Sequence, residues 1–112
     1  MKYYIAGPML RKPHYNFPAF DAARDMLLRE GHEVVNPADM DRTIGVDANI
    51  MPEDTDWSAI PAGMDKDATI RNDIAALLGC DAIYMLKDWA MNDGSTAEFA
   101  VARWAGKVIR CE

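Results

Sequence analysis

The sequence predicts an α/β fold in which a parallel sheet of four or five strands lies between two layers of helices. Three observations favour this class. Four short apolar segments alternate along the chain with three longer segments of helical periodicity. Glycine or proline stands at most of the boundaries between them. The length of 112 residues suits one domain with one hydrophobic core.

The first part of the chain predicts a strand, a helix and a second strand. Residues 2–6 (KYYIA) are short and apolar and stop at a Gly-Pro pair, which is typical of a strand. A helix is expected over 16–31, with Asn16 as its N-cap, a proline in its first turn and Gly31 as its stop. Residues 32–37 (HEVVNP) form the second expected strand.

The rest of the chain begins with a long polar segment and then resumes the alternation. Residues 38–63 are broken by Pro52, Pro61 and Gly63, and we expect them to form a loop excursion. A second helix is expected over 65–79 and a third strand over 80–86. The last helix is expected from about Thr96 to Ala105, followed by a fourth strand at 107–111.

This alternation predicts how the strands are ordered in the sheet. Right-handed crossovers leave few topologies, and the order 2-1-3-4 is favoured. The predicted fold is a small three-layer sandwich that resembles the flavodoxin and Rossmann folds. Ligands of such folds bind beyond the carboxyl ends of the strands, where the chain reverses direction. Here the loops at 7–10 (GPML) and 87–95 (KDWAMNDGS) line that crevice.

Glu98 stands in the first turn of the last expected helix, and two interpretations of it are open. In the first, Ser95 and Glu98 form a capping box, which ties each side chain to the other's backbone amide. In the second, the position of Glu98 at the crevice directs its carboxylate towards a ligand. Gly94 stands beside it and would allow a close backbone approach.

Asp73 is a second candidate carboxylate, on the second expected helix. At about 100° per residue it lies about 40° from Leu77, at the edge of the apolar face. A charge so near the core must be paired, for example with Arg71 or Lys87, or it must line a cavity. Two carboxylates that converge on a crevice suit glycosidic chemistry, in which one attacks an anomeric carbon and the other handles a proton.

Tyr4 and the two crevice loops add further candidates. Tyr4 ends the first strand, so it either packs in the core or holds a carboxylate in place through its hydroxyl. Arg11 and Lys12 follow the first loop and are within reach of a phosphate, although the loop is not a P-loop and can equally be a solvated charged loop. Trp57 and Trp89 can either stack on a planar base or pack in the core.

Charge and cysteine content exclude several classes of partner. The formal net charge is −6 and there is no basic run, which argues against a nucleic-acid polymer or an anionic membrane as the main partner. Cys80 and Cys111 lack metal-type spacing and His14 and His32 stand apart, so no zinc site is predicted. We expect free thiols in a cytoplasmic protein, although one disulfide is arithmetically possible. No apolar run is long enough for a signal peptide or a membrane span.

Four stretches in order resemble the nucleoside 2-deoxyribosyltransferase-like superfamily, and most closely a small, often phage-encoded branch of it. They are YYIAGPM, GHEVVNPA, RNDIAALLGCDAIYML and NDGSTAEFAVARWAG. Together they extend over nearly the whole chain, whereas residues 40–65 have no counterpart that we can place.

The resemblance implies a role for each candidate. Glu98 would be the nucleophile that attacks C1′ of a 2-deoxyribosyl group, Asp73 would assist protonation of the base, and Tyr4 would orient the nucleophile. Asn92 would touch the 5′ end of the sugar, and Arg11 lies near a phosphate-binding arginine of the nucleotide-hydrolysing branch. The substrate-binding residues expected from the two loops are Ala6, Gly7, Pro8, Met9, Arg11, Trp89, Asn92, Gly94 and Ser95.

The expected activity is cleavage of the N-glycosidic bond of a 2′-deoxyribonucleoside 5′-monophosphate, or of a nucleoside, by hydrolysis or base transfer. The chemistry needs no cofactor and no metal, because the carboxylates supply it. One alternative is a non-catalytic module that sequesters a nucleotide, and another is an NAD-cleaving enzyme. A small sheet with two open edges also predicts a homo-oligomer, a dimer or larger. In the resembled superfamily a neighbouring subunit often helps to close each site.

Overall fold

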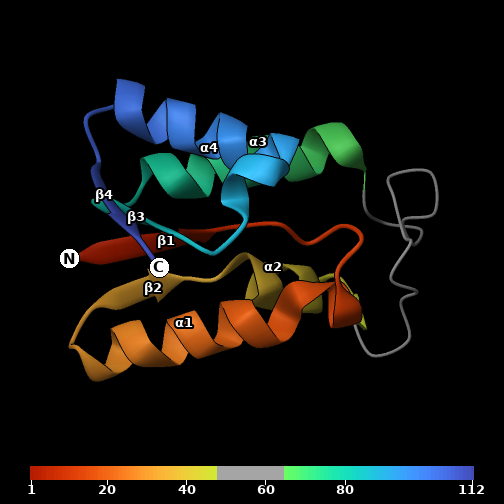
Figure 1. The fold of residues 1–112 in the computed structure, drawn as a ribbon. Coiled ribbons are helices and arrows are strands. Elements are labelled where there is room, and N and C mark those ends of the chain that lie inside the picture. The colour runs from red at the N-terminus through yellow and green to blue at the C-terminus, as the bar shows by residue number, and fades with distance from the viewer. Residues whose placement is uncertain (48–64) are drawn as a thin grey trace.

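The computed structural model describes residues 1–47 and 65–112, and it confirms the predicted α/β class. Four parallel strands form one sheet in the predicted order, β2-β1-β3-β4, and helices cover both of its faces (Figure 1). The strands are β1 (Lys2–Ala6), β2 (Glu33–Val35), β3 (Ala82–Met85) and β4 (Val108–Cys111). The helices are α1 (Phe17–Arg29), α2 (Pro37–Thr43), α3 (Lys66–Leu78) and α4 (Asp93–Trp104), with 3₁₀ turns η1 (Pro13–Asn16) and η4 (Trp89–Met91).

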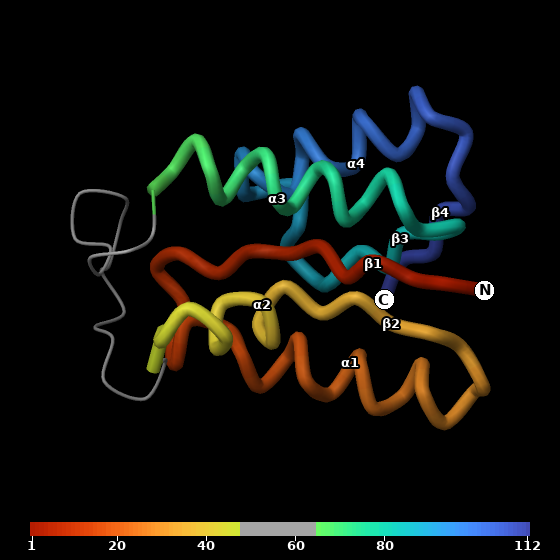
Figure 2. The backbone as a smooth tube through the Cα atoms, turned by 180° about the vertical axis from the view of Figure 1, so that it is seen from behind, coloured from red at the N-terminus to blue at the C-terminus, as the bar shows by residue number. Residues whose placement is uncertain are grey.

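The sheet separates two helical layers, one made of α1 and α2 and the other of α3 and α4. Figure 2 shows the same separation from behind. Side chains of β1 alternate between the two faces, as a strand requires. Tyr3 and Ile5 pack in the core on the α1 side, whereas Tyr4 packs with Leu77 of α3 and Ala102 of α4. Tyr4 therefore lies on the face that carries α3 and α4.

The predicted excursion at 38–63 is wrong over its first residues, because these form α2. Asn36 caps this helix, and its Oδ1 accepts a hydrogen bond of 3.1 Å from the amide of Ala38. Pro37 occupies the first helical turn, where its missing N–H and fixed φ favour a helix start. Residues 48–63 of the excursion, including Trp57, lie outside the described residues.

The two ends of α1 differ in how well the sequence predicts them. Gly31 has a φ of +90° just beyond the helix, as expected of a glycine stop. Asn16 stands at the N-cap position, but it does not cap the helix. Its φ is +58°, and its side-chain amide donates to the carbonyl of Pro8 at 2.7 Å. Asn16 thus fixes the loop after β1 to the start of α1.

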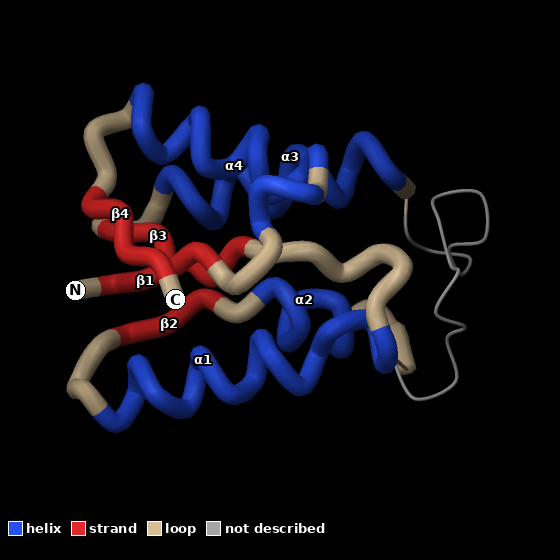
Figure 3. Tube along the Cα trace, viewed as in Figure 1, coloured by secondary structure: helices blue, strands red, loops and turns tan. Residues whose placement is uncertain are grey.

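The loops that follow β1 and β3 lie side by side at the carboxyl end of the sheet (Figure 3). A Cβ placed on Gly7 would lie 2.7 Å from Cβ of Leu86, so the two loops approach too closely there for any larger residue. Lys12 and Asp88 join the same loops through an ion pair of 3.4 Å. The predicted crevice is therefore bounded by two loops that are fixed to each other.

Two further observations concern the described part of the chain. No helix within the described residues is both long and apolar enough to cross a membrane. Cys80 is buried, Cys111 is exposed, and both are free thiols.

Candidate active site

A cavity of about 760 Å³ opens beyond the carboxyl ends of β1 and β3. Its walls come from the loops after these strands, from η1 and α2 on one side and from α3 and α4 on the other. The three predicted catalytic residues, Tyr4, Asp73 and Glu98, all line it. Of the predicted substrate-binding residues, the lining includes Gly7, Pro8, Met9, Arg11, Asn92, Gly94 and Ser95.

Glu98 is held by Tyr4 and not by its own backbone. The Tyr4 hydroxyl donates a short hydrogen bond to Oε2 of Glu98, between the central strand and the first turns of α4. The two residues are 94 positions apart in the sequence, so the contact depends on the fold. Of the two interpretations of Glu98, the structure supports the carboxylate that faces a cavity.

The other interpretation, a capping box of Ser95 and Glu98, does not form, because α4 begins at Asp93 with Asn92 as its N-cap. The Oδ1 atom of Asn92 accepts a hydrogen bond of 2.9 Å from the amide of Ser95. Ser95 is buried, and its hydroxyl donates to the carbonyl of Trp89 at 2.7 Å. The start of α4 is therefore stabilised without Glu98, whose side chain is free to point into the cavity.

Asp73 lies on α3 and faces the same cavity as Glu98. Burial raises the pKa of Asp73 to about 6. An ion pair with Arg71 or Lys87 would lower this pKa, so the structure favours the alternative in which Asp73 lines a cavity.

The site holds fewer negative charges at neutral pH than its carboxyl groups would carry in water. Burial, together with the charge of Asp73, raises the pKa of Glu98 to about 8, although the Tyr4 hydrogen bond opposes this rise. Burial and both carboxylates raise the pKa of Tyr4 well above its usual value, so Tyr4 stays protonated as a donor. Proton sharing among close carboxyl groups is typical of acid–base sites.

Asp41 and Tyr15 also line the cavity, and sequence analysis missed both. Asp41 is only 7% exposed, and burial and Asp73 raise its pKa to about 7. One signal could have found it, since the Asn36-Pro37 pair is a typical helix start and Asp41 follows Ala38 at helical spacing. No motif distinguishes Tyr15, which lies in the irregular turn η1.

Trp89 and Ala6 are not brought into the described lining of the cavity, although both were predicted to bind substrate. The Trp89 ring stacks on Phe99 of α4, with centroids 4.5 Å apart, so it packs as a core residue. Ala6 is the last residue of β1, and its side chain is buried against the α3–α4 layer. Both residues belong to the apolar packing on the α3–α4 side of the sheet and do not line the cavity.

Two cations stand at the loop side of the cavity. Arg11 is exposed and lines the cavity, and its φ of +63° marks a sharp turn in the loop after β1. Lys12 also lines it while pairing with Asp88. Within residues 1–47 and 65–112, no group of three or more His, Cys, Asp or Glu side chains is arranged to hold a metal ion.

Comparison with solved structures identifies a similar fold. The structure of 2-deoxyribosyltransferase from the psychrotolerant bacterium Bacillus psychrosaccharolyticus matches with a TM-score of 0.66 and 17% sequence identity. The match covers 99% of this chain and 71% of that chain. This chain therefore has a fold similar to that of this 2-deoxyribosyltransferase.

Comparison of the sequence with known proteins and families gives two results. No curated protein is detectably similar. A family model described as "Domain of unknown function (DUF4406)" matches residues 1–111, which is nearly the whole chain. The chain therefore belongs to the DUF4406 family.

Proposed function

We propose that this protein cleaves the N-glycosidic bond of a 2′-deoxyribonucleoside 5′-monophosphate through a covalent glycosyl-enzyme intermediate on Glu98. One observation carries the proposal: Glu98 is held by the Tyr4 hydroxyl inside a cavity that a second protonatable carboxyl group, Asp73, also lines. The fold shared with a 2-deoxyribosyltransferase supports the same reaction class. A site of this kind is suited to double displacement at a sugar carbon.

In the first step, a carboxylate oxygen of Glu98 attacks C1′ and the bond from C1′ to the base nitrogen breaks. The electron pair leaves with the base, which takes a proton from Asp73 or from a water held by it. In the second step, Asp73 removes a proton from water, the water oxygen attacks C1′, and Glu98 is released. A second base in place of water would give base transfer.

The preference for a nucleotide over a nucleoside rests on Arg11 and Lys12. Both cations line the cavity on the side of the loop after β1. A phosphate bound there would satisfy the guanidinium of Arg11 and compete with Asp88 for Lys12, which pairs only loosely at 3.4 Å. Asn92 lines the same cavity and adds a polar group for the 5′ end, although its Oδ1 already caps α4.

The proposal is tested by incubating the purified protein with the four 2′-deoxynucleoside 5′-monophosphates and the matching nucleosides, and measuring free base. Release of base from a nucleotide is expected in water alone. Added second base distinguishes transfer from hydrolysis, because a new nucleotide then forms. Binding of nucleotides without any release of base would instead indicate a sequestering module.

Replacement of Tyr4 by phenylalanine is expected to lower kcat/KM by about 10- to 100-fold, the value of a hydrogen bond to a charged group. The reactive form has Glu98 ionised and one proton on Asp73, so kcat/KM should peak between pH 6 and 8, the pKa values of Asp73 and Glu98. Tyr4 lowers the pKa of Glu98. Tyr4→Phe should therefore move the high-pH limb of the profile further upward.

The matched control is Tyr3→Phe, which removes a hydroxyl from the same strand on the opposite face of the sheet. It should keep the wild-type rate and pH profile. An unchanged high-pH limb in Tyr4→Phe would show that Tyr4 does not act on the ionisation of Glu98.

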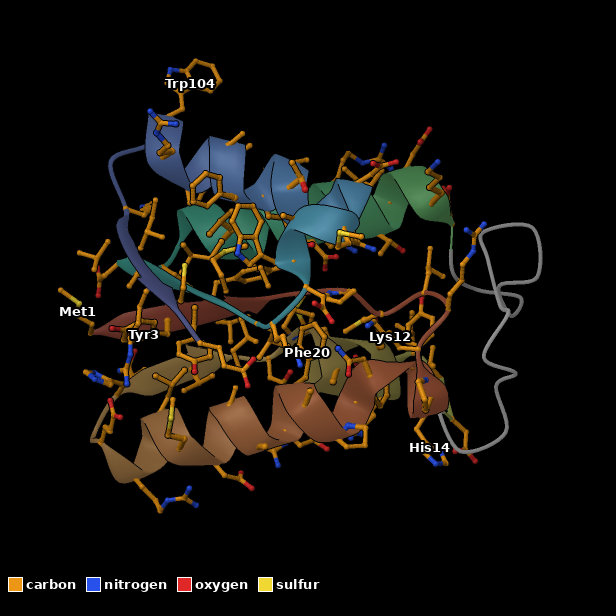
Figure 4. All side chains as sticks on the ribbon, viewed as in Figure 1. Met1, Tyr3, Lys12, His14, Phe20 and Trp104 are labelled. Atoms are coloured by element: carbon orange, nitrogen blue, oxygen red, sulfur yellow. The ribbon has the colours of Figure 1, made fainter. Side chains whose placement is uncertain are left out.

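We also propose that the protein self-associates through its α3–α4 layer. The support is a set of exposed apolar side chains: Trp104 and Met91 are 90% and 87% exposed, and Ile70 and Leu78 of α3 are 46% and 48% exposed. Figure 4 shows Trp104 projecting from the end of α4. Large apolar side chains this exposed are candidate contacts with a second copy of the chain.

Replacement of Trp104 by serine is expected to weaken that association and shift the protein towards the monomer at micromolar concentration. Loss of a large aromatic anchor commonly costs an interface about 2 kcal/mol or more. Light scattering coupled to size-exclusion chromatography measures the mass. Arg103→Ser, the adjacent exposed position, is the control. A wild-type monomer at this concentration would contradict the proposal.

A further inference from the structure

Asp41 is a carboxyl group in the cavity for which the proposed mechanism has no use. It lies on α2, is only 7% exposed, and lines the cavity. No described side chain or backbone group hydrogen-bonds its carboxyl oxygens, and no described cation pairs with them. Since no fully buried side-chain oxygen of the described residues lacks a partner, the carboxyl group of Asp41 is open to the cavity, where a ligand or water can satisfy it.

Asp41 lies nearer to Asp73 than to Glu98. All three carboxyl groups line the main cavity, but of the three only Asp41 and Asp73 also share the wall of a second hollow of about 480 Å³. The pKa values of two tyrosines agree with this placement. Burial raises the pKa of Tyr4 most, and among the carboxyl groups Glu98 and then Asp73 raise it more than Asp41 does. Burial also raises the pKa of Tyr15 most, followed by Asp41 and then by Asp73. The carboxyl groups therefore run in the order Glu98, Asp73, Asp41.

This order matches the layout of a nucleotide whose C1′ lies at Glu98. The departing base would lie beside Asp73, and its outer edge would lie towards Asp41. Burial and the charge of Asp73 raise the pKa of Asp41 to about 7, so a large share of molecules carry a proton there at neutral pH. A protonated carboxyl group offers one donor and one acceptor side by side.

We propose that Asp41 is a specificity-determining residue that binds the outer edge of the nucleobase and favours the amidine edge of adenine or cytosine. On that edge an exocyclic amine donates to the carboxyl C=O, while the adjacent ring nitrogen accepts from the carboxyl O–H. Because ring nitrogen is a stronger base than a carbonyl oxygen, this edge is preferred over the amide edge of guanine or thymine. The inference rests on the proposed function, since it assumes a nucleotide in this cavity.

The test measures the Kd of each of the four 2′-deoxynucleoside 5′-monophosphates by calorimetry in a Glu98→Ala background, where no turnover occurs. With Asp41 present, the adenine and cytosine nucleotides should bind more tightly than the other two. Asp41→Ala should weaken these two by about 10- to 100-fold, as expected when a buried polar group of the ligand loses its partner. Asp41→Asn keeps one donor and one acceptor and should retain most of the preference.

Asp39→Asn is the matched control, because this carboxylate lies on the same helix but pairs with Arg24 and Arg42 at the surface. It should leave all four affinities unchanged. The thermal unfolding of each variant checks that it is folded, and Asp41→Asn remains informative if Asp41→Ala is not. The inference would be overturned if Asp41→Ala left the affinity for every nucleotide unchanged. It would also be overturned if Asp41→Ala weakened the binding of all four nucleotides equally.

Failure of this inference and failure of the proposed function give different results. Base release by the wild type, with a base preference that Asp41→Ala leaves intact, would overturn the role of Asp41 alone. A base preference that depends on Asp41 in a wild type that releases no base would overturn the enzymatic function alone. Absence of nucleotide binding in every variant would overturn both.

Discussion

Replacement of Glu98 by alanine is expected to lower base release by at least about 10³-fold, while the protein keeps its fold. The rate falls because no other group in the proposed mechanism can form the bond to C1′, and removal of a nucleophile commonly has effects of this size or larger. The fold should persist because Asn92 and Ser95, not Glu98, stabilise the start of α4. Free base is measured by chromatography, and folding by thermal unfolding.

Two further measurements make this prediction specific to a nucleophile. Added formate or azide, small enough to occupy the space of the lost carboxylate, should restore part of the activity of Glu98→Ala. Thr96→Ala changes an exposed residue in the same part of α4 and should behave as the wild type. Base release by Glu98→Ala at the wild-type rate would show that Glu98 is not the nucleophile.

The free energy of unfolding is expected to fall by several kcal/mol as the pH rises from about 4 to 8. The pKa values of Glu98, Asp41 and Asp73 are raised in the fold to about 8, 7 and 6. Above pH 4.5 the unfolded chain releases these protons while the folded protein still holds them, so the unfolded state gains stability with rising pH. Each unit of difference corresponds to about 1.4 kcal/mol.

Urea unfolding at pH 5, 6.5 and 8 measures this dependence. Glu98→Gln should reduce the loss of unfolding free energy over the whole range up to pH 8. Asp73→Asn should reduce that loss mainly in the part of the range below pH 6. Ion-paired acids affect stability in a different pH range. Arg42 lowers the pKa of Asp21, so the stability that this pair contributes is lost only as the pH falls below about 4. A stability that increases from pH 5 to 8 would contradict the raised pKa values.

The sheet and the flanking helices α1, α3 and α4 were predictable because short apolar runs alternate along the chain with longer segments of helical periodicity. Residues 82–86 are all buried, which their unbroken hydrophobicity indicates. The helix α2 was not predicted, because it is only seven residues long and Pro37 was interpreted as a strand end. The same proline starts the helix once Asn36 caps it. Short helices depend on such local contacts more than on periodicity.

The site was predictable where its residues stand at the ends of elements. Tyr4 lies in β1 and Glu98 in the second turn of α4, and the predicted topology brings this strand and this helix together beside the crevice. Trp89 also follows a strand, but its ring stacks on Phe99 of α4 and does not face the cavity. Asp41 was missed because α2 was not predicted, and it is the path of this helix along the cavity wall that distinguishes Asp41 from the other aspartates.

The hydrogen bonds at the start of α4 have a consequence for the adaptability of this scaffold. Asn92 accepts from the amide of Ser95 in the first turn of the helix, and the Ser95 hydroxyl anchors the preceding turn by donating to the carbonyl of Trp89. The side chain at position 98 can therefore be exchanged without unravelling the loop that frames the cavity. A chain built in this way can acquire or lose a reaction through one substitution, because the architecture and the chemistry depend on different atoms.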